Sequence, residues 1–81
     1  MFNESLPVID MQATGRNIEK LRRLNRLKVV DVQDYFDFNT PQAIYKWERG
    51  RSLPSLENLL ALAKIYNCAI EDIIVVRDHK P

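Results

Sequence analysis

The sequence predicts an all-α fold, a bundle of five short helices. Two observations carry this prediction. Apolar residues recur at helical spacings, and residues typical of helix starts and ends separate the segments. No segment shows the alternation of apolar and polar residues that is typical of a half-buried strand. The 81 residues, 46% of them hydrophobic, are enough for one domain with a single small core.

The first two helices are predicted over residues 10–25 and 29–36. Asp10 can cap the first of them with its carboxylate. Valine is a mediocre helix former, so packing rather than propensity must hold the valine-rich second helix. The apolar positions at helical spacing are Met11, Ile18 and Leu21 in the first helix and Val29, Val32, Tyr35 and Phe36 in the second.

Thr40 followed by Pro41 marks the start of a third helix, because a hydroxyl caps the N-terminus and proline fits the first helical position. We predict this helix over residues 41–49, with Gly50 as the left-handed residue that ends it. A fourth, leucine-rich helix is predicted to begin at Ser55 and to end near Asn67.

A last short helix is predicted over residues 70–74. The domain therefore covers residues 10–76, with an extended arm at 1–9 and a tail at 77–81. Residues 6–9 and 73–76 are unusually apolar for chain ends. They could pair with each other, form a dimer contact or cover the core.

Composition excludes several classes of function. A single cysteine, Cys68, and a single histidine, His79, leave no disulfide framework and no cysteine- or histidine-based metal site. Apolar runs such as residues 73–76 are far too short to span a membrane. We therefore expect a soluble cytoplasmic domain that is not an enzyme, with no cofactor, no metal and no small-molecule ligand.

The formal net charge of +1 hides a segregated distribution. Residues 16–28 carry six basic side chains against one acidic side chain, and residues 46–51 carry three against one. Basic segments of this kind bind nucleic acid, but they are also common on solvated helix faces. Lys20, Arg23 and Arg26 are expected to be solvated on the side opposite to any such partner.

The helices at 29–36 and 41–49, joined by about four residues, have the layout of a helix-turn-helix. Ile44, Trp47 and Glu48 fall on one side of the helix at 41–49, and Trp47 and Glu48 are expected to be structural residues. The other side carries amide, phenol, ammonium and guanidinium groups, which suit base edges and phosphates in the major groove of double-stranded DNA. The base-edge candidates are Gln42, Tyr45 and Lys46; the phosphate candidates are Arg16, Lys28, Asn39, Thr40, Arg49, Arg51 and Ser52.

Residues 17–74 also resemble a known family, the Cro/cI-type phage repressors and the bacterial xenobiotic-response-element (XRE) regulators. The resemblance lies in the segments NIEKLRRLNRL, PQAIYKWERGRSLPSLENLLALAKIYN and AIEDII. It implies a five-helix lambda-repressor-like domain that binds a pseudo-palindromic operator as a homodimer, with half-sites about one helical turn apart. It also implies that Arg22 and Glu48 form a partly buried ion pair.

The chain departs from the family pattern around the second helix. Lys28 and Val29 stand where relatives usually have Ser or Thr followed by Gln, and Asp37 replaces the glycine of the turn. The turn is also one residue longer than the common form. The alternative to a DNA-binding repressor is a protein-interaction module, such as an antitoxin-like partner, built on the same fold.

Overall fold

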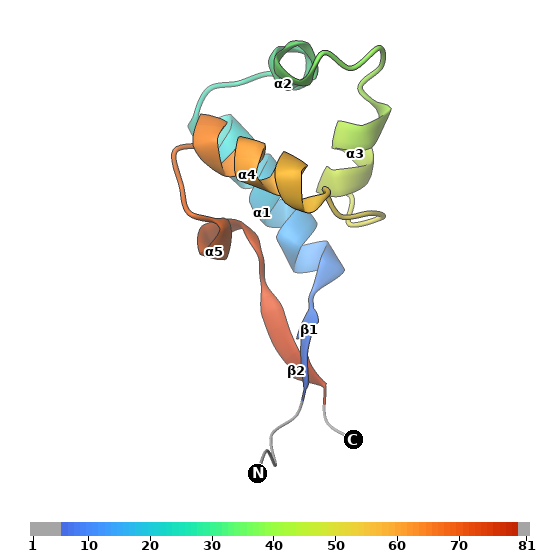
Figure 1. The fold of residues 1–81 in the computed structure, drawn as a ribbon, viewed down its shortest axis with the longest axis vertical. Coiled ribbons are helices and arrows are strands. Elements are labelled where there is room, and N and C mark those ends of the chain that lie inside the picture. Colours follow the sequence, from blue (N-terminus) through green and yellow to red (C-terminus); the bar gives the residue numbers. More distant parts are fainter. Residues whose placement is uncertain (1–5, 80–81) are drawn as a thin grey trace.

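The computed structural model describes residues 6–79, with side chains described for residues 6–77. Five helices form the body of the molecule (Figure 1). This confirms the predicted five-helix fold, with boundaries that differ by one or two residues. The helices are α1 (Met11–Leu24), α2 (Val29–Phe36), α3 (Gln42–Glu48), α4 (Leu56–Ile65) and α5 (Ile70–Ile73).

The helices enclose one apolar core to which each of them contributes. Its centre is α4, whose Leu62 is fully buried, and Ile44 of α3 and Val32 of α2 are also fully buried. Burial of these side chains, rather than helix propensity, holds elements as short as α3 and α5. The core residues are Ile18, Val32, Ile44, Trp47, Leu59, Leu62, Ala63, Tyr66 and Ile73.

Capping residues fix where the helices begin and end. The Asp10 carboxylate accepts from the Ala13 amide at 3.0 Å, and the Ser55 hydroxyl accepts from the Asn58 amide at 3.1 Å. Asn67, just beyond α4, has the left-handed φ of 55° that ends a helix. Asp10 therefore caps α1 as predicted, and α4 begins at its N-cap, Ser55, and ends near Asn67 as predicted.

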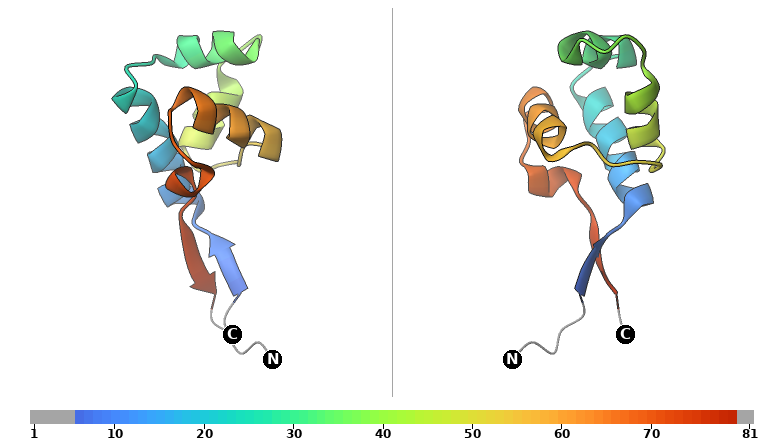
Figure 2. Two further views of the ribbon diagram at one scale, coloured as in Figure 1. Left: turned by 60° about the vertical axis from the view of Figure 1, so that its left-hand side comes forward. Right: turned by 45° about the vertical axis from the view of Figure 1, so that its right-hand side comes forward.

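A two-stranded antiparallel ribbon projects from one end of the body (Figure 2). β1 (Leu6–Ile9) pairs with β2 (Val76–His79). The expectation that the chain contains no strands was therefore wrong, because two four-residue strands from opposite ends of the chain leave no local pattern. The apolar ends follow two of the three alternatives. Residues 6–9 pair with residues 76–79, so Val76 alone of the second apolar segment takes part, whereas Ile73 is buried in the core and Ile74 packs against it. Residues 1–5 of the predicted arm and 80–81 of the predicted tail lie outside the described residues.

The ribbon is tied to the body at its root. The Val75 amide donates to the Thr14 hydroxyl at 2.9 Å, and the Asp10 amide donates to the Val75 carbonyl at 2.8 Å. Thr14 is only 1% exposed, so its hydroxyl is a buried polar group, and its partner is Val75, the residue before β2. These bonds fix the direction in which the ribbon leaves α1.

Candidate nucleic-acid interface

The two faces of α3 differ sharply in burial. Ile44 is fully buried and Trp47 is 4% exposed. The side chains that the sequence predicted to point outward are all exposed, namely Gln42, Tyr45, Lys46 and Arg49. Four polar or aromatic groups therefore face solvent from a helix whose other face is anchored in the core.

Two glycines let α1 approach the end of α3 through backbone contact. A Cβ atom on Gly15 would lie 2.7 Å from the carbonyl oxygens of Trp47 and Glu48. Gly50 has a φ of +70°, as predicted for the residue ending this helix, and a Cβ there would lie 2.8 Å from the Met11 carbonyl oxygen. Any larger residue at either position would push the two helices apart.

An ion pair fixes the rotation of α1 against α3. Arg22 Nε donates to Glu48 Oε2 at 2.7 Å and Arg22 Nη2 to Glu48 Oε1 at 3.2 Å, a bidentate arrangement. The side chains are 9% and 7% exposed, and Arg22 Nη1 also donates to the Leu27 carbonyl at 2.9 Å. The hydrogen bond that Arg22 donates to Glu48 raises the pKa of Arg22 above its ordinary value, so this guanidinium stays charged.

The Tyr66 hydroxyl is buried in the same region. Burial raises the pKa of Tyr66, and the negative charge of Glu48 raises it further. Among the described side chains, this hydroxyl oxygen is the buried polar atom without a hydrogen-bond partner. The Tyr66 ring therefore stabilises the core, whereas its unsatisfied hydroxyl lowers the stability of the fold.

The turn between α2 and α3 is closed by a glutamine. Gln33 Nε2 donates to the Phe38 carbonyl at 3.2 Å, and the Phe38 amide donates back to the Gln33 carbonyl at 3.0 Å. Asp37 adopts a φ of 58°, so it takes the left-handed conformation that relatives give to glycine. The longer turn is thus ordered by the hydrogen bonds of Gln33 and by the left-handed backbone of Asp37, a residue that departs from the family pattern.

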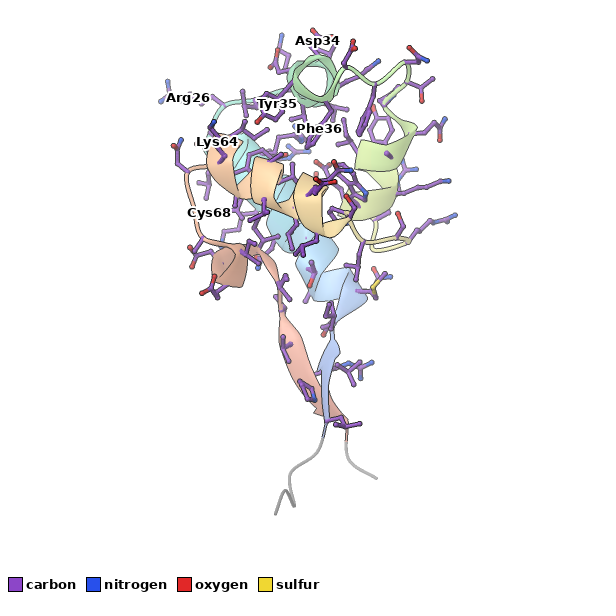
Figure 3. The ribbon with its side chains drawn as sticks, viewed as in Figure 1. Arg26, Asp34, Tyr35, Phe36, Lys64 and Cys68 are labelled. Atoms are coloured by element: carbon purple, nitrogen blue, oxygen red, sulfur yellow. The ribbon has the colours of Figure 1, made fainter. Side chains whose placement is uncertain are left out.

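Aromatic packing joins this turn to α3. Phe36 stacks on Phe38 with ring centroids 5.0 Å apart, and the rings of Phe36 and Trp47 make a T-shaped contact with centroids 5.6 Å apart. Figure 3 shows Asp34 on the outer side of α2, whereas Phe36 points toward the body of the molecule. Trp47 is therefore a packing residue, as expected.

The predicted phosphate-contact residues flank α3 on both sides. Asn39 and Thr40 are exposed just before it, and the Thr40 hydroxyl accepts weakly from the Gln42 amide at 3.4 Å. Arg51 is exposed and Ser52 half-buried in the loop that follows α3. These four residues lie at the ends of the helix that carries the base-edge candidates.

The two remaining candidates lie on other helices. Lys28 is the exposed N-cap residue of α2, and its backbone amide donates to Asp31 Oδ2 at 2.7 Å. Arg16 is exposed on α1. It borders a shallow groove along that helix together with Lys20 and Arg23.

A polar cleft of about 340 Å³ is bordered by α1, α3 and the start of α2. At its edge, the guanidinium carbon of Arg49 lies 5.3 Å from the centroid of the Tyr45 ring, a cation–π contact. The cleft is lined by Glu19, Arg22, Arg23, Val29, Tyr45, Glu48 and Arg49.

Arg23 is the basic residue that the sequence reasoning misplaced. It was expected on the opposite side, but it borders the same cleft as Tyr45 and Arg49 and pairs with Glu19 at 2.7 Å. The implied Arg22–Glu48 pair was the available hint, because it places α3 beside the part of α1 that carries Arg23. Arg26, by contrast, lies on the side of the molecule away from α3 (Figure 3).

Among the described side chains, no group of three or more His, Cys, Asp or Glu residues could hold a metal ion. None of the helices in the described part of the chain has the length and apolar character needed to cross a membrane.

These features define a helix-turn-helix domain. One helix is anchored by its inner face, follows another helix and a tight turn, and exposes basic and amide groups on its outer face. Residues 18–73 match the sequence model of a helix-turn-helix family. The chain belongs to this family, the XRE-type DNA-binding transcription regulators. No curated protein sequence matches the chain significantly.

Solved structures share the fold at low sequence identity. The restriction-modification controller protein C.AhdI from Aeromonas hydrophila superposes with a TM-score of 0.69 at 22% identity, over 79% of this chain and 96% of that one. The DNA-binding domain of BldD from S. venezulae gives 0.67 at 17%, over 80% and 96%. The clp gene regulator ClgR from C. glutamicum gives 0.66 at 19%, over 78% and 80%.

Proposed function

We propose that this chain is a non-enzymatic repressor that binds a pseudo-palindromic operator as a homodimer, with α3 in the major groove. The observation that carries the proposal is the exposed face of α3, where Gln42, Tyr45, Lys46 and Arg49 project from a helix fixed by its other face. One helix of seven residues buries too little surface for high specificity, so two copies are needed.

Each side chain on this face has a role that follows from its chemistry. Gln42 is in the first turn, where recognition helices meet base edges, and its amide can pair with both hydrogen-bonding atoms of adenine. Lys46 suits guanine, and Tyr45 suits a thymine methyl group or a phosphate. The phosphate ligands in this proposal are Arg16, Lys28, Asn39, Thr40, Arg49, Arg51 and Ser52.

Repression follows from occlusion. A dimer seated on an operator that overlaps a promoter excludes the polymerase without any further domain. The fold and the C.AhdI and ClgR likenesses support a regulatory role, since those two proteins are by name a controller protein and a gene regulator. The site of action would be the cytoplasm, where the DNA of a bacterium or phage is found.

The test starts with selection of bound duplexes from a random DNA pool. We expect a two-fold motif to be enriched, with an affinity that falls steeply as salt is raised, because phosphate contacts release counterions. Failure to enrich any motif would contradict operator binding and would direct the search toward a protein partner.

Replacement of two residues of α3 then separates base reading from phosphate binding. Gln42→Ala should weaken binding to the selected operator by about 1–3 kcal/mol and relax the preference at one base position. Arg49→Ala should weaken binding to all sequences alike and reduce the salt slope by about one. Lys64→Ala is the control, because Lys64 lies away from α3 (Figure 3). Wild-type affinity and preference in Gln42→Ala would refute the assignment of this face.

A further inference from the structure

The ribbon of β1 and β2 lies outside the part of the chain that the family shares. Both strands fall beyond residues 18–73, one on each side. A two-stranded ribbon alone is only marginally stable in water, because it buries little surface. Leu6 is 75% exposed and Val76 53%, so this ribbon also leaves apolar side chains in solvent. Such an element gains stability if a further strand pairs with it.

The backbone orientation of the ribbon follows from its root. The Asp10 amide donates to the Val75 carbonyl, so the peptide groups of these two residues point toward the opposite strand. This orientation alternates along a strand. In the register that pairs Ile9 with Val76, every second residue therefore points its N–H and C=O toward the other strand (inward), and the residues between point theirs away from it (outward). The outward residues are Pro7 and Ile9 on β1 and Val76 and Asp78 on β2.

The two outer edges therefore differ. On β1 one of the two outward positions is Pro7, which has no N–H and cannot donate to a neighbouring strand. On β2 both outward residues, Val76 and Asp78, have an N–H and a carbonyl. Proline is a common means of blocking a sheet edge. Only the edge of β2 can thus accept another strand with a full set of hydrogen bonds.

We propose that β2 pairs antiparallel with β2 of a second copy, giving a four-stranded sheet in the order β1-β2-β2-β1. This inference rests on the proposed function, which requires a homodimer, and it names the surface through which the two copies bind. Antiparallel pairing of two identical edges has two-fold symmetry, so both copies use the same surface. Pro7 then occupies both outer edges of the joint sheet, and assembly stops at two chains.

This arrangement suits binding to one duplex. In the left view of Figure 2 the ribbon is seen face-on and α3 lies behind α4. The two-fold axis of the joint sheet is perpendicular to the sheet, so rotation about it keeps α3 of the second copy on the same side. Both recognition helices can then meet the same face of the DNA.

The pairing also opposes two like charges. If Val76 of one copy pairs with Asp78 of the other, the two Arg77 side chains lie directly across the axis from each other. Both are exposed, so salt screens their repulsion. The dimer should therefore tighten as salt is raised, whereas binding to DNA weakens.

The deciding experiment is sedimentation velocity of the full chain without DNA. Val76→Pro removes an outward N–H and leaves the inward bonds of the ribbon intact, as Pro7 does on β1. We expect a dimer for the wild type and a monomer for Val76→Pro. Val76→Ala, which keeps the N–H, should remain a dimer, and circular dichroism should show helical content unchanged in both variants.

The opposite change tests the blocked edge. Pro7→Val restores an N–H to the outer edge of β1, so dimers should associate further into higher oligomers as concentration rises. A monomeric wild type, a dimeric Val76→Pro or a Pro7→Val variant that remains a dimer would overturn the proposal. Because the masses are measured without DNA, failure of the ribbon contact is distinguishable from failure of operator binding, which the duplex selection measures.

Discussion

At the scale of single residues, two ion pairs of equal length differ in their surroundings. Arg22–Glu48 and Arg23–Glu19 both have a shortest N–O distance of 2.7 Å. The first pair is almost fully buried and joins α1 to α3, whereas the second is exposed and lies within α1. Burial, not distance, decides what each pair contributes, because water screens the exposed charges.

Glu48→Ala should destabilise the fold by about 3–5 kcal/mol, because it leaves the Arg22 guanidinium buried without its counter-charge. Urea unfolding followed by circular dichroism measures this. Glu19→Ala, which breaks the exposed pair, should cost less than about 1 kcal/mol. Equal losses in the two variants would contradict the role given to burial.

Removal of the unsatisfied Tyr66 hydroxyl should raise the stability of the fold, in contrast to removal of Glu48. Tyr66→Phe removes a buried group that has no partner, so stability should rise by about 1 kcal/mol. Because burial raises the pKa of the folded phenol, the unfolded chain ionises first, and wild-type stability falls above about pH 10. This loss should be absent from Tyr66→Phe.

Thermal unfolding between neutral pH and pH 11 gives both measurements. Tyr45→Phe is the matched control, since its hydroxyl is lost from an exposed side chain. A less stable Tyr66→Phe at neutral pH would mean that the hydroxyl has a partner, such as a buried water.

At the scale of secondary-structure elements, the helices were predictable because each begins or ends at a residue with a distinct physical role. Asp10, Ser55 and Gly50 mark boundaries by capping or by a positive φ, and these signals are local. The strands were missed because four residues at one end of the chain pair with four at the other. The apolar segments at the two ends were a partial hint, because Val76 alone of residues 73–76 belongs to β2.

The candidate interface was predictable to a similar extent. The inward and outward residues of α3 follow from helical period, so the exposure of Gln42 and Tyr45 could be foreseen. The position of Arg23 could not be read from its own helix alone, since it depends on how α1 packs against α3. Gln33 was equally hidden, because its role lies in closing a turn longer than the common form.

The packing of α1 against α3 gives a test at this scale. Gly15→Ala places a methyl group 2.7 Å from two backbone oxygens, so the helices must separate. We expect a net loss of about 1–3 kcal/mol in stability, although alanine is the better helix former. Gln12→Ala, at an exposed position of α1, should be neutral or slightly stabilising in the same urea titration. An unchanged Gly15→Ala would contradict the close approach of the two backbones.

At the scale of the whole molecule, the elongated shape affects the spacing of half-sites expected in the proposed operator. The chain extends 46 Å along its longest axis and 22 and 20 Å across, with the ribbon at one end (Figure 1). Two copies joined through their ribbons would hold their helical bodies at opposite ends of the assembly. The two α3 helices would then be further apart than in a dimer joined body to body.

The half-sites should accordingly be separated by more than the single turn of about 34 Å that the family resemblance implies, and about two turns is the next spacing that presents the same face of DNA. Duplexes with half-sites one turn, one and a half turns and two turns apart distinguish the cases by affinity. Tightest binding at one turn would point to a compact dimer and count against the ribbon contact.

The glycine contact between α1 and α3 has a consequence for how new specificities arise. The position of α3 is set by main-chain atoms at Gly15 and Gly50 and by side chains on its inner face. None of these belongs to the outward face. Gln42, Tyr45 and Lys46 can therefore be exchanged for other side chains while the position of the helix stays the same. Under the proposed function, evolution or design could then adapt this one fold to many different operators.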